Sequence, residues 1–119
     1  MAIHSCKDLI VWQRSMHVAR EVYRITEQFP KAELFGLTSQ MRRAVVVIPS
    51  NIAEGFSRKH RKEYRQFLAI AFSSATELET QLILSKDLQF LSDADFHAID
   101  LPLEETRKML NKMITILLN

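Results

Sequence analysis

Apolar residues recur at helical spacing near the start of the chain, in two parallel stripes along residues 7–28. The first stripe consists of Leu9, Trp12, Met16, Ala19, Tyr23 and Thr26, and the second of Val11, Val18, Val22, Ile25 and Phe29. Alternating steps of three and four residues are typical of a helix packed in a bundle. One stripe is enough to bury such a helix, so we expect the second stripe to face another subunit.

The stretch VVVIPSNIAEGFSRKHRKEY, residues 45–64, has the composition of either a buried strand or a kinked helix. The longer pattern around it decides the question. Apolar residues step by four, three, four, four and four, at Leu37, Met41, Ala44, Ile48, Ile52 and Phe56. No strand produces that spacing, so we predict a helix over 34–56 with Pro49 inside it and a kink at that point. Gly55 suits the end of this helix.

Two further helices are predicted over 61–91 and 93–118. The first carries a heptad of Tyr64, Leu68, Ala71, Ala75, Leu78, Leu82 and Ser85, supported by Phe67, Phe72, Leu84, Leu88 and Leu91. Ser92 or Asp93 is the predicted N-cap of the last helix, which Pro102 either kinks or divides. The predicted fold is therefore all-α, a single domain over 1–119 forming an antiparallel up-down-up-down four-helix bundle.

Composition narrows the functional classes. The chain is 47% hydrophobic and 25% charged, as expected of a globular protein, and Cys6 is its only cysteine. A single thiol excludes an intrachain disulfide and fits a reducing compartment, so we expect a cytoplasmic protein. No uninterrupted apolar run is long enough to span a bilayer, and we expect no membrane association. The net charge is only +2, so any binding of nucleic acid depends on how the charge is distributed.

Residue patterns that support catalysis are missing from the sequence. His4, His17, His60 and His97 are scattered and form no metal-binding motif. The neighbouring carboxylates Glu77 and Glu79, and likewise Glu104 and Glu105, point to different sides of a helix. We therefore predict no enzymatic activity, no metal and no cofactor.

Polar residues line one side of the predicted helix 34–56. They form, with a residue of the following helix, a polar set of Gln40, Arg43, Asn51, Glu54 and Glu77. Ser50 lies on the same side, and Arg43 and Glu54 are three turns apart at nearly the same angle. We expect a structural network inside the bundle or at a subunit interface, since buried charges need partners. A ligand site is the alternative.

A cluster of basic residues lies at the junction of helices 34–56 and 61–91. This basic corner consists of Arg58, Lys59, His60, Arg61, Lys62 and Arg65, and Arg42 is expected to contribute from further back. Such a run is usually solvated surface or caps a helix end. In a symmetric oligomer, however, the corner repeats around an axis and creates a positive region suited to phosphate backbones.

The motif LTSQMRRAVVVIPSNIAEGFSRK resembles the signature of the 23S ribosomal RNA intervening sequence proteins, also called the four helix bundle protein family. KDLIVWQRSMHVAREVY, FPKAELFGL and FLAIAFSSATELETQL resemble its flanking elements. The matching positions are Gln40, Arg42, Arg43, Asn51, Ile52, Ala53, Glu54 and Gly55, followed by Glu77, Glu79 and Gln81. The resemblance implies a bacterial four-helix bundle assembled as a ring-shaped homopentamer, without an established catalytic residue.

A similar fold occurs in the accessory variability determinant proteins, which bind nucleic acid and a reverse transcriptase. Together, the basic corner and the resemblance favour a non-enzymatic homo-oligomer that binds RNA or DNA backbone. The alternative is a scaffold for a partner enzyme that itself makes no contact with nucleic acid.

Overall fold

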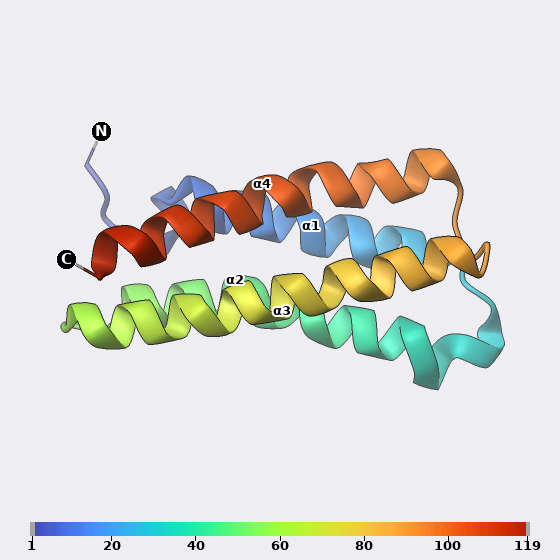
Figure 1. Cartoon of the computed structure of the whole chain (residues 1–119), viewed down its shortest axis with the longest axis horizontal. Coiled ribbons are helices and arrows are strands. Elements are labelled where there is room, and N and C mark those ends of the chain that lie inside the picture. Colours follow the sequence, from blue (N-terminus) through green and yellow to red (C-terminus); the bar gives the residue numbers. More distant parts are fainter. Residues whose placement is uncertain (1, 119) are drawn as a thin grey trace.

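The computed structural model describes residues 2–118 of the chain, which form four long antiparallel helices (Figure 1). These helices are α1 (Ile10–Thr26), α2 (Ser39–Phe56), α3 (Arg61–Asp87) and α4 (Asp93–Leu117). Short 3₁₀ turns at Cys6–Asp8 and Lys31–Glu33, and a π-helical segment at Leu34–Thr38, complete the helical structure of the described residues. Each long helix packs against two neighbours, α1 and α3 each lying beside α2 and α4. The predicted up-down-up-down bundle is confirmed.

The core-facing side of α1 differs from our expectation. Val11, Val18 and Val22 are buried inside the single chain, so the prediction that their stripe faces another subunit is wrong. In the other stripe, Tyr23 is 43% exposed, and Leu9, Trp12 and Ala19 pack at the edge of the core only partly buried. The two stripes share similar periodicity, and only the positions of α2 and α4 decide which of them points inward.

The prediction that Pro49 lies inside a helix is confirmed, because α2 is one helix with the buried Pro49 in its interior. The kink at this point stays a prediction. Met41, Ile48 and Ile52 are fully buried, as the spacing predicts. Residues 34–38 form a separate π-helical turn in which Gly36 has non-helical backbone angles, φ −111° and ψ −118°. The regular helix therefore starts five residues later than predicted.

Gly55 allows α2 and α3 to approach closely near the connection between them. A Cβ atom at this position would lie 2.9 Å from Cβ of Phe67 and 3.2 Å from the carbonyl oxygen of Tyr64. These neighbours belong to α3, one of them to its backbone, so they cannot move aside easily.

We therefore expect Gly55→Ala to destabilise the protein. Alanine gains about 1 kcal/mol over glycine in helix propensity, but overpacking of a tight contact costs about 1–3 kcal/mol. The expected net loss is about 1 kcal/mol, measured by urea unfolding. A stabilised Gly55→Ala variant would contradict the close approach of the two helices.

The last two helices keep most of the predicted core positions. Leu68, Leu78 and Leu82 of α3 are fully buried, but Leu84 is exposed, because it lies on the opposite side of α3 from its buried heptad. Leu88 is also exposed, and it lies just beyond α3, which ends at Asp87, four residues before the predicted end. Ser92 caps α4 by accepting a hydrogen bond from the Asp95 backbone N–H at 3.1 Å.

Of the two alternatives predicted for Pro102, division of the fourth helix does not occur, because α4 is continuous through that residue. A kink at Pro102 stays a prediction. The Pro102 carbonyl oxygen accepts a hydrogen bond from the Thr106 hydroxyl at 2.8 Å.

Within 2–118, α3 is the one helix that by length and composition could cross a membrane. Length and composition alone are weak evidence for a membrane span, since the core helix of a bundle has the same properties. The buried leucines of α3 pack against the other helices.

Candidate nucleic-acid interface

The basic corner lies at the tip of the α2–α3 hairpin, at the end of the bundle where α4 also ends (Figure 1). α2 ends at Phe56, and α3 begins at Arg61 after a four-residue connection, 57–60. Most of the cluster is therefore presented on a short loop and on the first turns of α3. Rigid helices on both sides fix the position of this loop.

Arg58 is held in place by its neighbours. Its Nη2 atom donates to Oε1 of Glu54 at 2.6 Å, and its Nη1 atom lies 3.8 Å from Oε2 of Glu63. The guanidinium group also lies over the Phe67 ring, 4.8 Å from its centroid. Arg58 is thus largely neutralised by acids of the same chain, and it contributes less positive potential than its sequence position suggests.

Arg61 and Arg65 bind the carboxyl end of α4. Nη2 of Arg61 donates to the Ile116 carbonyl oxygen at 3.0 Å, and Nη1 of Arg65 donates to the Leu117 carbonyl oxygen at 3.3 Å. The last carbonyl groups of a helix lack partners within the helix and carry partial negative charge, so cations stabilise them. These two arginines therefore join α3 to α4 as well as adding charge.

Lys59, His60 and Lys62 differ from the arginines of the basic corner in having no bound neighbour within residues 2–118. All three are exposed, and their side chains make no hydrogen bond or ion pair with another residue of the described chain. The amino end of α3 lies in the same place and has no side-chain cap, so its backbone N–H groups add positive potential. Burial raises the pKa of the nearby Tyr64 hydroxyl. The arrangement is suited to binding phosphate groups.

Arg42 does not belong to the basic corner. It lies near the start of α2, about 20 Å along the helix from the hairpin tip. Its guanidinium group donates to the Thr26 hydroxyl at 2.9 Å and to Glu27 at 3.0 Å, and it lies over the Tyr23 ring. Through these contacts Arg42 links α2 to the carboxyl end of α1. Its place in the predicted helix 34–56 already implied this separation from the hairpin tip.

The polar set does not form the expected network inside the bundle of one chain, and the subunit-interface alternative stays untested. Gln40, Arg43, Glu54 and Glu77 are exposed, so the buried version of this network is wrong. Glu54 binds Arg58 instead of Arg43, and the Asn51 amide donates to the Val47 carbonyl oxygen of its own helix at 2.8 Å. The structure does bring Arg43 and Glu77 together at the rim of one shallow hollow between α2 and α3. The ligand-site alternative stays untested.

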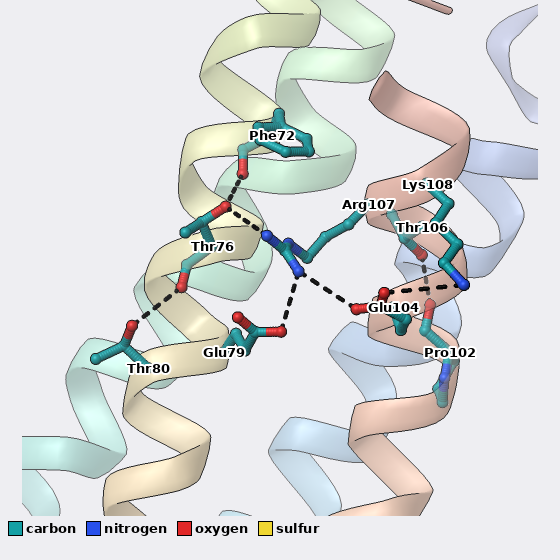
Figure 2. Close-up of polar contacts among 9 residues, drawn as sticks. All are labelled: Phe72, Thr76, Glu79, Thr80, Pro102, Glu104, Thr106, Arg107 and Lys108. Atoms are coloured by element: carbon teal, nitrogen blue, oxygen red, sulfur yellow. Dashed lines mark hydrogen bonds and ion pairs between the residues drawn. The ribbon is translucent and has the colours of Figure 1, made fainter. Parts of the chain in front are cut away.

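A polar cluster that sequence reasoning missed joins α3 and α4 around Arg107 (Figure 2). Nη1 of Arg107 binds Oε2 of Glu79 at 3.0 Å and Oε2 of Glu104 at 3.3 Å. Its Nη2 atom lies 3.4 Å from the Thr76 hydroxyl, and the guanidinium group lies 5.4 Å from the centroid of the Phe72 ring. The only signal in the sequence was the i, i+3 spacing of Glu104 and Arg107, which gave no indication of Glu79. The cluster joins α3 to α4 and stabilises their packing.

Metal-binding side chains do not cluster in residues 2–118. No three histidine, cysteine or acidic side chains of that part of the chain are placed to hold a metal ion. Fold and site together define a small antiparallel helical-bundle protein with a basic hairpin tip.

Comparison with known proteins then places the chain in a particular family. Residues 7–112 match the family model described as 23S rRNA-intervening sequence protein, and the chain belongs to that family. A crystal structure of a protein of unknown function from the S23 ribosomal protein family of Bacteroides thetaiotaomicron has a similar fold, with a TM-score of 0.80 and 23% sequence identity. The similarity covers 88% of this chain and 98% of that one. A search of curated proteins finds no match.

Proposed function

We propose that this protein is a non-enzymatic, self-associating cytoplasmic protein that binds the backbone of RNA or DNA through the basic corner. The observation that carries the proposal is the exposed group of Lys59, His60 and Lys62 at the tip of a rigid hairpin. Lysines that have no acidic partner within residues 2–118 can neutralise phosphates and release counterions. Backbone contacts of this kind position a nucleic acid without reading its sequence.

Self-association strengthens this mode of binding. One corner supplies few free charges, because Glu54 and Glu63 neutralise Arg58. Several corners brought to one end of an assembly would add their potentials, and two or more sites on one nucleic acid gain from high effective concentration. The ring of five copies that the family resemblance implies would have this effect.

The proposal predicts a specific weakening of binding when the free lysines are removed. Lys59→Ser with Lys62→Ser should weaken binding to a labelled RNA hairpin at least tenfold at low salt. The slope of log affinity against log salt should fall by about two, about one for each phosphate that a lysine no longer neutralises. Fluorescence anisotropy over a series of salt concentrations measures both quantities.

The matched control removes the same charge elsewhere. Arg20→Ser with Lys31→Ser replaces one exposed residue of α1 and one exposed residue near the opposite end of the bundle, which should leave the salt slope nearly unchanged. Equal weakening in the two variants would mean that net charge alone governs binding. Unchanged affinity in Lys59→Ser/Lys62→Ser would show that the corner is not the site.

A further inference from the structure

Phe35 has the most exposed large apolar side chain of the described residues, at 91%. It lies on the π-helical turn Leu34–Thr38, at the end of the bundle opposite the hairpin tip (Figure 1). The turn is capped by Glu33, whose Oε1 atom accepts the Leu37 backbone N–H at 3.1 Å. A capped turn between α1 and α2 thus holds an aromatic ring in solvent.

The Phe35 ring borders an open hollow of about 600 Å³, formed where α1, the π-helical turn and α2 meet. Leu34, Val46 and Val47 give this hollow an apolar wall, and the first two are themselves about half exposed. Phe35 is therefore part of an apolar patch rather than a single exposed side chain. Patches of this kind mark interaction sites.

The charged side chains that line this hollow are both cationic. Arg42 is occupied by Glu27 and covers the Tyr23 ring. Arg43 is exposed and makes no hydrogen bond or ion pair with the rest of residues 2–118. The hollow therefore offers one free aromatic ring and one free cation, and none of the described residues that line it is acidic. This combination is complementary to a planar ring that carries an anion.

We propose that this hollow binds an unpaired nucleotide of a nucleic-acid strand, with the base stacked on Phe35 and its phosphate held by Arg43. The proposal rests on the backbone binding in the proposed function and adds a second contact, which selects single strands. Every base can stack on an aromatic ring, and a guanidinium group forms strong hydrogen bonds with phosphate. Bases of a duplex are already stacked on one another and do not reach such a ring.

The open form of the hollow favours a nucleotide within a strand over a free nucleotide. Sites for free small molecules enclose most of the ligand surface, whereas this hollow is open and leaves Phe35 largely in solvent. A strand that is also bound at the basic corner compensates through its high effective concentration.

The hollow and the basic corner lie at a distance that one strand can bridge. Arg43 is about 24 Å from Lys59 along α2, which about seven stacked nucleotides span. Residues 44–53 between them contain no acidic or basic residue. The strand is therefore held at two separate places on the bundle.

Substitutions of Phe35 test the stacking. Phe35→Ala should bind a labelled single-stranded RNA at least about fivefold more weakly than the native chain does, with no change toward an RNA duplex of the same length. Phe35→Trp should keep the native affinity, whereas Phe35→Leu, which is apolar but has no aromatic face, should lose as much as Phe35→Ala. Leu101→Ala removes a 62% exposed side chain from α4 and should change neither affinity.

Three results would overturn the stacking. The first is unchanged single-strand affinity in Phe35→Ala or in Phe35→Leu. The second is equal weakening of Phe35→Ala toward the single strand and the duplex. The third comes from light scattering without nucleic acid: a lower mass for Phe35→Ala than for the native chain would mean that another copy of the chain covers the ring.

Arg43→Gln tests the phosphate contact separately. It should weaken single-strand binding and lower the slope of log affinity against log salt by about 0.7, the value for one phosphate of a single strand. Arg20→Gln, which replaces an exposed arginine of α1 outside the hollow, should leave the slope unchanged. An unchanged slope in Arg43→Gln overturns the contact.

Failure of the hollow is distinguishable from failure of the basic corner. Lys59→Ser/Lys62→Ser should weaken binding of both the single strand and the duplex, whereas Phe35→Ala should weaken only the first. Lys31, which the charge control of the basic corner replaces, does not line the hollow. A native chain that binds neither probe overturns both proposals.

Discussion

Replacing Val18 by aspartate should leave most of the protein unfolded at room temperature. Val18 lies in the centre of the bundle with no exposed surface, among the helices that α1 contacts. The variant loses about 1.5–3 kcal/mol of apolar burial and places an unpaired carboxylate where no cation can reach it, at a further cost of several kcal/mol. The sum approaches the entire stability of a small domain, about 5–15 kcal/mol. Circular dichroism and urea unfolding measure the loss.

The comparison with Tyr23→Asp makes this result informative. Tyr23 belongs to the other apolar stripe of α1 and is half exposed, so its replacement should cost only about 1 kcal/mol. The reverse ranking, with Tyr23→Asp unfolded and Val18→Asp stable, would mean that α1 is rotated about its axis relative to the bundle described above.

Replacing Arg107 by alanine should cost about 2–3 kcal/mol of unfolding free energy. Its side chain is only 21% exposed and that of Glu79 is 31% exposed, so the ion pair is shielded from water better than a surface pair. Loss of the guanidinium group leaves the Glu79 carboxylate without a cation, while Glu104 keeps Lys108 at 3.9 Å. Removing one partner of a buried pair costs about 3–5 kcal/mol. The partial exposure reduces that figure.

Arg14→Ala is the control for Arg107→Ala. Arg14 also forms an ion pair between two helices, with Glu105, but both side chains are about half exposed. Pairs of that kind contribute about 0–1 kcal/mol. Urea unfolding of the two variants should therefore differ by at least about 1 kcal/mol. Equal losses would show that the Arg107 cluster has no special role in joining α3 to α4.

Hydrophobic spacing predicted the helices well because burial in a bundle imposes it directly. The steps from Met41 to Ile52 identified α2 as a helix despite Pro49, and the Leu68–Leu82 repeat identified the core of α3. The same reasoning failed for the orientation of α1. Two stripes about one third of a turn apart satisfy the same periodicity, and the choice between them depends on contacts with α2 and α4.

The basic corner was predictable as a cluster of residues, but which of its side chains pair within the chain was not. Sequence order places Lys59 and Lys62 together with Arg58, and the i, i+4 spacing of Glu54 and Arg58 is compatible with their ion pair. Because Arg58 lies beyond the predicted helix 34–56, the folded chain was needed to show that this pair forms while the two lysines make none. The binding of Arg61 to the end of α4 joins residues 55 positions apart. This contact between α3 and α4 depends on where the two helices end in space, and the spacing of residues along one helix does not predict that.

Titration of a fluorescently labelled structured RNA and a matched DNA duplex with the native protein, at several salt concentrations, tests the central claim most directly. Binding through phosphate contacts should be clear at low salt and should weaken steeply as salt rises, with a slope of at least about −2 in log affinity against log salt. The ratio of the two affinities identifies the preferred nucleic acid. Absence of binding to either probe at low salt would contradict a nucleic-acid role for the basic corner.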